Sequence, residues 1–305
     1  MHKMKADKIW MDGKFVDWDK AKVHVLTHAL HYGSGVFEGI RAYKTEQGTA
    51  IFRLTEHVDR LFNSAKILKL ELSYSKEEIS QAIKETVRVN RLESCYIRPL
   101  IYRGYRKLGL NPFSCPVQFM VAAWEWGAYL GEEALAKGIK AIISSWQRSH
   151  INSTSAKAKL CANYINSIFA NMEATELGVD EAILLDSNGY VAEGPGENIF
   201  WIKDGIIFTP PLTSVLDGIT RNTVMTITRD MGYEVREELV ARDVLYIADE
   251  AFFVGSAAEL TPIREIDRYI LGSGDRGPIS KKIQEKLFNV FKGKERKYLQ
   301  WLDFV

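Results

Sequence analysis

Residues 193–221 read EGPGENIFWIKDGIIFTPPLTSVLDGITR, and this stretch carries the clearest signal in the chain. Glu193 is followed by the glycine- and proline-rich turn 194–196 and by two short apolar runs, NIFWIK and IIFT, which are typical of strands. The run LDGITR, from Leu216, reads as the start of a helix, where Gly218 permits close approach to the backbone. Exposed N–H groups at a helix N-terminus bind phosphate. The stretch therefore predicts a carboxylate and a phosphate-binding turn among short strands.

A lysine in the run SAKAKLCANY offers a chemical partner for this carboxylate. Small and apolar residues follow Lys159, and partial desolvation favours the uncharged amine that a Schiff-base nucleophile requires. Lys157 is a rival candidate that the local sequence does not exclude. An amine, a carboxylate that keeps a pyridine nitrogen protonated and a phosphate-binding turn together meet the needs of pyridoxal 5′-phosphate chemistry. We therefore expect this cofactor, with Glu193 as the partner of its ring nitrogen.

Composition and charge narrow the class of protein. The chain has 305 residues, enough for two domains, and its 46% hydrophobic and 26% charged residues are typical of a soluble globular protein. A formal net charge of +1 gives no global attraction to nucleic acid or to an anionic membrane. No apolar run approaches the ~18 residues that span a bilayer, and the N-terminal MHKMKADK lacks the apolar stretch of a signal peptide. Three scattered cysteines indicate a reduced, cytoplasmic protein.

The first half of the chain predicts strands mixed with two helices. Residues 8–16 form a hairpin, because the Asp-Gly dipeptide inside them supplies a two-residue turn that fits the twist of paired strands. Apolar residues at helical spacing follow Thr55, a candidate N-cap. A second helix opens with the capping box SKEE at 75–78 and runs toward Asn90. Two apolar strands follow, at 95–102 and 116–124.

The second half predicts a meander of short strands with three helices. Strands are expected at 138–145, 181–186, 190–193, 198–203 and 206–209. Helices are expected from about 164 to 178, from about 218 to 232, and from 281 onward. The run WEWGAYLG, which contains two glycines and no periodicity, marks a boundary. We expect an α/β fold of mixed α+β type, with a smaller N-terminal domain over 1–125, a linker over 126–134 and a larger C-terminal domain over 135–305.

Two further motifs suggest chemistry that the rest of the sequence does not support. His24, His28 and His31 include a pair four residues apart, but no acidic residue stands at matching spacing and the stretch indicates strand and turn rather than helix. We therefore expect no metal site. The glycines of HYGSGVFEG are too few and differently spaced for a dinucleotide-binding fingerprint.

Taken together, these residues resemble the fold-type IV pyridoxal-phosphate enzymes, and most closely the branched-chain amino acid aminotransferases. The likeness covers nearly the whole chain. Its motifs are HYGSGVFEGIR from His31, HVDR from His57, YIRP from Tyr96, KLCANY from Lys159, VGSAAELTP from Val254 and the stretch 193–221. The resemblance favours Lys159 over Lys157, since the family lysine lies five residues before the tyrosine of an Asn-Tyr pair. It also implies a homo-oligomer, at least a dimer.

The resemblance assigns roles position by position. Lys159 would be the catalytic residue, bonded to the cofactor and carrying the substrate proton. The other cofactor-binding residues, together with Gly218 of the helix start, would be Arg60, Tyr164, Glu193, Leu216, Ile219, Thr220 and Ser256. The substrate would be bound by Tyr32, Phe37, Tyr96, Arg98, Trp126, Tyr129, Ala257 and Ala258, with Tyr164 also in the aromatic wall. Pro195 and Ser256 stand where the family usually has a small residue and a threonine.

These roles imply a branched-chain-amino-acid transaminase with a ping-pong mechanism. The amino group of L-leucine, L-isoleucine or L-valine would pass to 2-oxoglutarate, so small molecules are the expected partners, without nucleic acid or membrane. Arg98 would pair the distal carboxylate of 2-oxoglutarate, while the aromatic wall takes the aliphatic side chain. The alternatives are a D-amino-acid or (R)-amine transaminase of the same fold, or an aminodeoxychorismate lyase. The Tyr-x-Arg spacing of Tyr96 and Arg98 resembles that of the branched-chain type, so the resemblance favours that type over the alternatives.

Overall fold

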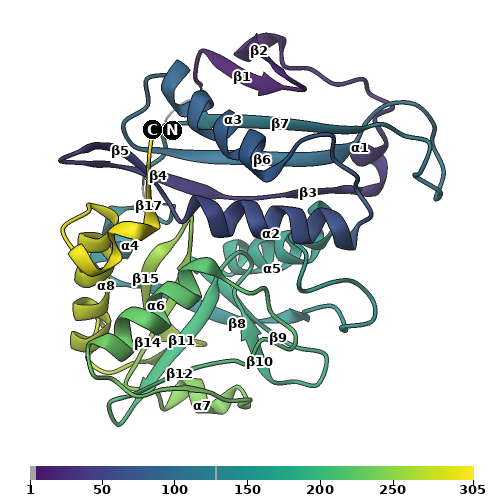
Figure 1. The fold of residues 1–305 in the computed structure, drawn as a ribbon. Coiled ribbons are helices and arrows are strands. Elements are labelled where there is room, and N and C mark those ends of the chain that lie inside the picture. Colours follow the sequence, from purple (N-terminus) through teal and green to yellow (C-terminus); the bar gives the residue numbers. More distant parts are fainter. Residues whose placement is uncertain (1–4, 128) are drawn as a thin grey trace. The chain divides into compact units, whose positions relative to one another are not determined.

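The computed structural model describes residues 5–127 and 129–305, which form the mixed α/β fold that the sequence predicts (Figure 1). Two compact units are present. Unit 1 comprises Met1–Gly127, Ala158–Ala162 and Val290–Val305, and unit 2 comprises Ala128–Lys157 and Asn163–Asn289. Residues 1–4 and 128, which fall in the predicted N-terminal domain and linker, lie outside the described residues. The predicted domain bounds stay a prediction.

Unit 1 is built on an antiparallel sheet in the order β17-β5-β4-β6-β7-β1-β2, with β3 paired to β6. Its strands are β1 (Lys8–Met11), β2 (Lys14–Asp17), β3 (Gly35–Phe37), β4 (Ile40–Thr45), β5 (Gly48–Phe52), β6 (Cys95–Arg103), β7 (Val117–Trp124) and β17 (Leu302–Phe304). The helices α2 (Leu54–Ile67) and α3 (Lys76–Val89) bury apolar stripes, including Leu61 and Ile83, in one core with sheet residues such as Ile97. That core holds β6, which carries two of the predicted substrate residues.

Local sequence signals explain two element boundaries in unit 1. The hairpin is confirmed, with β1 paired to β2 around Asp12 and Gly13, both at positive φ. The capping box is also confirmed, because the Ser75 hydroxyl accepts from Glu78 N at 3.1 Å and the Glu78 carboxylate accepts from Ser75 N at 2.7 Å. The predicted N-cap at Thr55 is wrong. Arg53 is the N-cap of α2, with φ 53°, and its backbone N–H donates to Trp301 O at 2.7 Å.

The histidine stretch differs from its prediction of strand and turn. His28–Tyr32 form the short helix α1, which ends at Gly33 with φ 62° and a bond from its N–H to Ala29 O. The His28 ring is buried between Ser34 Oγ and the carbonyl of Gly109, so its nitrogens have structural partners.

Unit 2 is built on a mixed sheet in the order β10-β9-β8-β15-β14-β11-β12-β13. Its strands are β8 (Ile139–Gln147), β9 (Glu181–Leu185), β10 (Val191–Glu193), β11 (Asn198–Lys203), β12 (Ile206–Thr209), β13 (Val235–Glu237), β14 (Glu250–Gly255), β15 (Glu259–Ile266) and β16 (Tyr269–Ile270), which pairs with β15. Strand β10 pairs with β11 as well as with β9, so the path from β10 through β9, β8, β15, β14 and β11 closes into a ring. The predicted strands of the meander are confirmed.

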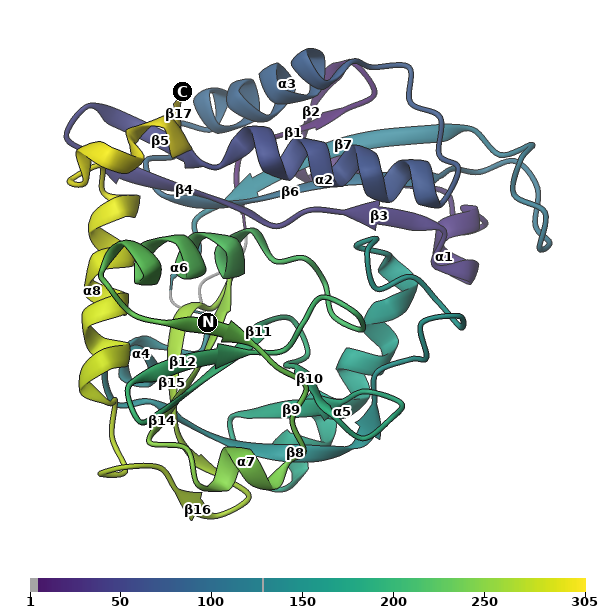
Figure 2. The ribbon, with the colours of Figure 1, turned by 60° about the horizontal axis from the view of Figure 1, so that its bottom comes forward.

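Helices cover this ring of strands (Figure 2). They are α4 (Glu132–Lys137), α5 (Tyr164–Glu176), α6 (Ile219–Asp230), α7 (Asp243–Tyr246) and α8 (Pro278–Phe291). Elsewhere in the chain, short 3₁₀ turns span Trp18–Lys20, Cys161–Asn163 and Arg296–Trp301. Helix α5 packs Ala170 and Ala174 against Ala182 and Leu184 of β9. It ends before Gly178, whose φ is 72°, as the sequence predicts.

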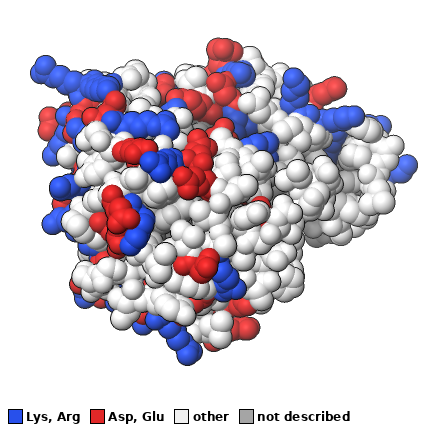
Figure 3. Space-filling view, turned by 90° about the horizontal axis from the view of Figure 1, so that it is seen from below, with Lys and Arg blue, Asp and Glu red and all other residues white. Residues whose placement is uncertain are grey.

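The surface carries charges of both signs. Basic and acidic side chains alternate over the face shown in Figure 3, beside an area without charged residues. Among the helices of residues 5–127 and 129–305, none combines the length and apolar character needed to cross a lipid bilayer.

Candidate active site

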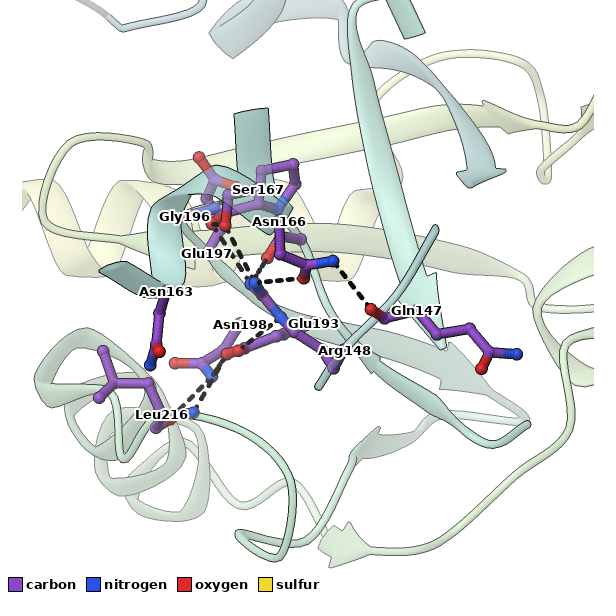
Figure 4. Close-up of polar contacts among 12 residues, drawn as sticks. Gln147, Arg148, Asn163, Asn166, Ser167, Glu193, Gly196, Glu197, Asn198 and Leu216 are labelled. Carbon is purple, nitrogen blue, oxygen red and sulfur yellow. Dashed lines mark hydrogen bonds and ion pairs between the residues drawn. The ribbon is translucent and has the colours of Figure 1, made fainter. Parts of the chain in front are cut away.

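Glu193 ends β10, and its carboxylate is held from two sides within unit 2 (Figure 4). Asn198 Nδ2 and the backbone N–H of Leu216 both donate to Oε2, each at 3.2 Å. On the other side, Arg148 Nε lies 3.0 Å from Oε1. The Glu193 side chain is only 10% exposed, so these groups replace water around the carboxylate. Such an oriented anion can bind a protonated ring nitrogen.

Asn198 joins this carboxylate to the start of α6. It pairs across strands with Glu193 and, on its other side, with Val254 of β14. Its Nδ2 also donates to Leu216 O at 3.1 Å. A β-carbon on Gly218 would overlap Asn198 Oδ1, so a side chain there would force Asn198 to move. Sequence reasoning did not single out Asn198, although it stands inside the EGPGENIF motif.

The predicted phosphate-binding residues of unit 2 lie at two turns. Ile219 and Thr220 form the first turn of α6, are buried, and follow the N-cap Gly218. Ser256 and its two successors, Ala257 and Ala258, form the tight turn between β14 and β15, where Ala258 O accepts from Thr261 Oγ1 at 2.9 Å. Because Asn198 contacts Gly218 and pairs with Val254, one residue links both turns to Glu193.

Lys159 and Lys157 have different surroundings. Lys157 is exposed, and its ammonium donates to the carbonyl of Leu212. Lys159 is half-buried in unit 1, its N–H donates to Ser64 Oγ at 3.0 Å, and its carbonyl accepts from Phe37 N at 3.1 Å. Its Nζ lies 5.3 Å from the centroid of the Phe37 ring, within cation–π range. Lys159 is therefore the lysine with the ordered backbone and the aromatic neighbour.

Four of the predicted substrate residues form one cluster in unit 1. The Arg98 guanidinium lies 4.4 Å from the Phe37 ring centroid, and Arg98 Nη2 donates to Tyr96 Oη at 3.0 Å. Trp126 meets the Tyr96 ring edge-on, at 4.6 Å and 87°. A β-carbon on Gly39 would lie 2.1 Å from Tyr96 Oη, so any larger residue there would displace the Tyr96 ring. An aromatic wall with one oriented guanidinium can hold an aliphatic chain and, separately, a carboxylate.

The remaining predicted aromatics belong to other segments of the chain. Tyr32 is at the end of α1, is 42% exposed, and contacts the rings of His28 and His31. Tyr164 begins α5, and Tyr129 is 39% exposed; both belong to unit 2.

Arg60 makes a buried ion pair that the sequence did not predict. Its Nε and Nη2 donate to the two carboxylate oxygens of Glu38 at 2.7 and 2.8 Å, which uses two of its five N–H groups. The His57 ring, through Nδ1, contacts the same carboxylate at 2.7 Å. Burial raises the pKa of Glu38, but Arg60 and His57 outweigh it and hold that pKa well below its usual range. Burial lowers the pKa of His57, so its ring is neutral at neutral pH and donates from Nδ1.

A second buried carboxyl group, that of Glu197, lies near Glu193. Glu197 Oε2 accepts from Gly196 N at 3.0 Å, and Glu197 O accepts from Gly194 N at 2.7 Å. Burial, and next the nearby Glu181, raise the pKa of Glu197 to about 8. Glu197 therefore carries a proton at neutral pH, a property that no motif in the sequence predicts.

The chain matches a known protein family over most of its length. The profile of the family described as "Amino-transferase class IV" matches residues 35–266. A branched-chain-amino-acid aminotransferase of Pseudomonas aeruginosa is 52% identical over 297 residues, which cover 97% of each chain. The branched-chain-amino-acid aminotransferase of Escherichia coli strain K12 is 48% identical over 305 residues, covering 99% of this chain and 98% of that protein.

Solved structures of branched-chain amino acid aminotransferases are also similar to this chain. A branched-chain amino acid aminotransferase of T.th. with pyridoxamine 5′-phosphate superposes with a TM-score of 0.96 at 51% identity, covering 99% of both chains. The T.th. enzyme complexed with N-(5′-phosphopyridoxyl)-L-glutamate gives a TM-score of 0.94 at 48% identity, again over 99% of both chains.

Proposed function

The chain belongs to the class IV aminotransferase family and, within it, to the branched-chain-amino-acid aminotransferases, and we propose that it transfers the amino group of L-leucine, L-isoleucine or L-valine to 2-oxoglutarate. The products would be the branched 2-oxo acids and L-glutamate. The enzyme is a pyridoxal 5′-phosphate-dependent aminotransferase, consistent with its relation to structures that contain forms of this cofactor.

The residues present fit the cofactor. The buried Glu193 carboxylate, bordered by Arg148 and two N–H donors, suits a protonated ring nitrogen. The N-terminus of α6 suits a phosphate group, because its backbone N–H groups can bind an anion. Gly218, the N-cap, has no β-carbon, and Asn198 occupies the space that one would take. The residues proposed to hold the cofactor are Lys159, Arg60, Tyr164, Glu193, Leu216, Gly218, Ile219, Thr220 and Ser256.

The proposed mechanism gives each residue one task. The chemistry supplied by the bound cofactor is an electron sink for the charge that develops at the substrate Cα. Lys159 Nζ would take the proton from the substrate Cα and deliver it to C4′ of the cofactor, because a single amine can serve as both general base and general acid. Glu193 would keep the ring nitrogen protonated, and Tyr164 would donate to or accept from the phenolic oxygen.

Substrate selection is proposed to depend on the unit 1 cluster. Arg98 is already oriented by Phe37 and Tyr96, so it can pair the distal carboxylate of 2-oxoglutarate without loss of much side-chain freedom. Tyr96 and the backbone near Ala257 and Ala258 would receive the α-carboxylate. Tyr32, Phe37, Trp126 and Tyr129 would contact the aliphatic side chain.

One observation carries the proposal: Asn198 connects the oriented Glu193 carboxylate to the N-terminus of α6. A test is to mix purified protein, pyridoxal 5′-phosphate, 2-oxoglutarate and either L-leucine or D-leucine, and to measure L-glutamate and D-glutamate separately. We expect glutamate with L-leucine only. Glutamate formed only with the D-isomer would favour a D-amino-acid transaminase, and pyruvate released from aminodeoxychorismate without an acceptor would favour the lyase.

We also propose that the chain forms homo-oligomers and works in the cytoplasm. Helix α5 exposes a row of apolar side chains, spaced to lie on one face, which supports self-association: Ile165, Ile168, Phe169 and Met172, all at least 38% exposed. Cys95, Cys115 and Cys161 are free thiols, which suits a reducing compartment. A mass equal to one chain in light scattering at micromolar concentration would contradict the first proposal.

A further inference from the structure

Arg148 connects three segments of unit 2 that are distant in sequence (Figure 4). It follows β8 directly, and its own N–H donates to Leu185 O of β9 at 2.8 Å. Its Nη2 donates to the carbonyls of Gly194 and Pro195, at 2.6 and 3.2 Å, and its Nη1 donates to Ser167 Oγ of α5 at 2.9 Å. The guanidinium is thus fixed by groups other than Glu193.

The remaining edge of the guanidinium faces Glu193. Arg148 Nε lies 3.0 Å from Glu193 Oε1, at an angle that makes this an ion pair rather than a hydrogen bond. The opposite carboxylate oxygen, Oε2, is the one that accepts from Asn198 and Leu216 N. Rotation of the carboxylate would break contacts on both sides, so its orientation is set by Arg148 together with Asn198.

The charges around Arg148 agree with this arrangement. Its side chain is 13% exposed and that of Glu193 is 10% exposed. The other carboxyl group near it, Glu197, keeps its proton at neutral pH because burial and Glu181 raise its pKa to about 8. The positive charge of Arg148 therefore faces the carboxylate of Glu193, 3.0 Å away.

We propose that Arg148 is a positioning residue that holds the Glu193 carboxylate in place for the cofactor's ring nitrogen. The inference rests on the proposed function, since it assumes that Glu193 meets that nitrogen. A purely structural role is the alternative, in which Arg148 only ties the turn 194–196 to β8 and α5. The two roles differ in what they predict for a cofactor analogue without the ring nitrogen.

The test compares two probes on cofactor-free protein: pyridoxal 5′-phosphate and its 1-deaza analogue, in which CH replaces the ring nitrogen. Dissociation constants are measured by spectroscopic titration for the wild type, Arg148→Met and Arg148→Lys. Ser167→Ala is the matched control, because it removes the bonds of the Ser167 hydroxyl to Arg148 and to Pro195 O but leaves the ion pair of Arg148 with Glu193 intact. Thermal unfolding is measured for each variant.

We expect Arg148→Met to weaken pyridoxal 5′-phosphate binding about 10- to 100-fold, the range for loss of a charged partner. Binding of the deaza analogue should change less than about threefold, as should binding of both probes to Ser167→Ala. Arg148→Lys, which retains the charge, should lie between wild type and Arg148→Met, and it preserves the test if Arg148→Met does not fold.

Equal losses for both probes, or no loss for either, would overturn the positioning role and leave the proposed function in place. If the wild type binds the deaza analogue as tightly as pyridoxal 5′-phosphate, Glu193 does not recognise the ring nitrogen and the inference fails. A wild-type protein that binds neither probe would overturn the proposed function as well.

Discussion

Asn198 and Gly218 are packed so closely that a β-carbon added to Gly218 would lie 1.9 Å from Asn198 Oδ1. The same amide donates to Glu193 Oε2 and to Leu216 O. The start of α6 and the Glu193 carboxylate therefore share one side chain, and moving it affects both.

Gly218→Ala should weaken cofactor binding about tenfold, because Asn198 must move and one or two hydrogen bonds of about 1 kcal/mol each are lost. The measurement is titration of cofactor-free protein with pyridoxal 5′-phosphate. Gly127→Ala is the control, since a β-carbon there meets no atom within 4 Å. Equal affinities for the two variants would contradict the prediction.

Lys159→Ala should lower the rate with L-leucine and 2-oxoglutarate by at least about 1,000-fold, because the group that moves the Cα proton is removed. Lys157→Ala should stay within about threefold of wild type, since Lys157 is exposed and its ammonium contacts a backbone carbonyl, that of Leu212. Steady-state rates of both variants are compared after their folding is checked by circular dichroism. The reverse order of activities would exclude Lys159 as the catalytic lysine.

Arg98→Met should reduce kcat/KM for 2-oxoglutarate about 10- to 100-fold, because a charged hydrogen-bonding partner of the distal carboxylate is lost. The half-reaction with L-leucine should change less than about threefold, since methionine keeps an apolar contact with Phe37. Single-turnover absorbance changes separate the two half-reactions. A uniform loss for both substrates would place Arg98 in the general architecture of the site.

Arg60→Met should destabilise the cofactor-free protein by about 3 kcal/mol, because it leaves the fully buried Glu38 carboxylate without its ion-pair partner. The exposed pair of Lys76 with Asp59 provides the control, and Lys76→Met should cost less than about 1 kcal/mol. Urea unfolding of both variants gives the free energies. A loss for Arg60→Met no greater than that for Lys76→Met would show that the buried pair adds nothing to stability.

Glu197→Gln should flatten the dependence of stability on pH. The folded protein keeps the Glu197 proton up to about pH 8, whereas the unfolded chain loses it near 4.5, so this group lowers stability as pH rises between those values. Glutamine resembles the protonated acid and removes the effect. The difference in unfolding midpoint between variant and wild type should grow in favour of the variant from pH 5 to pH 8. A constant difference would refute the raised pKa.

Signals that act over a few residues were predicted well from the sequence. The Asp-Gly hairpin and the Ser75 capping box each depend on backbone geometry within four residues, and both are present. The N-cap at Thr55 was wrong because Arg53, held by a bond to Trp301 O at the far end of the chain, starts α2 earlier. The helix α1 was missed because its support comes from distant contacts such as His28 with Gly109.

The residues of the candidate site also fall into those that local sequence predicts and those that it does not. The EGPGENIF motif and the LDGITR helix start predict Glu193 and Gly218, because these residues are themselves part of the motifs. The partners that hold these residues could not be predicted from the sequence. Arg148 and Glu193 come together only because β9 pairs with β8 on one side and with β10 on the other. The bond between Arg60 and Glu38 likewise depends on how α2 packs on its sheet.

The segment Ala158–Ala162 belongs to unit 1, although the residues on both sides of it belong to unit 2. The chain therefore crosses between units at 127/128, 157/158, 162/163 and 289/290, and neither unit is one uninterrupted stretch of gene. In a chimera of two homologous enzymes, replacing residues 128–289 as a block would import the donor's lysine together with the donor's carboxylate. The phenylalanine and the serine that fix the lysine backbone, Phe37 and Ser64, would still come from the recipient. Recombination that respects the architecture has to leave residues 158–162 with the recipient.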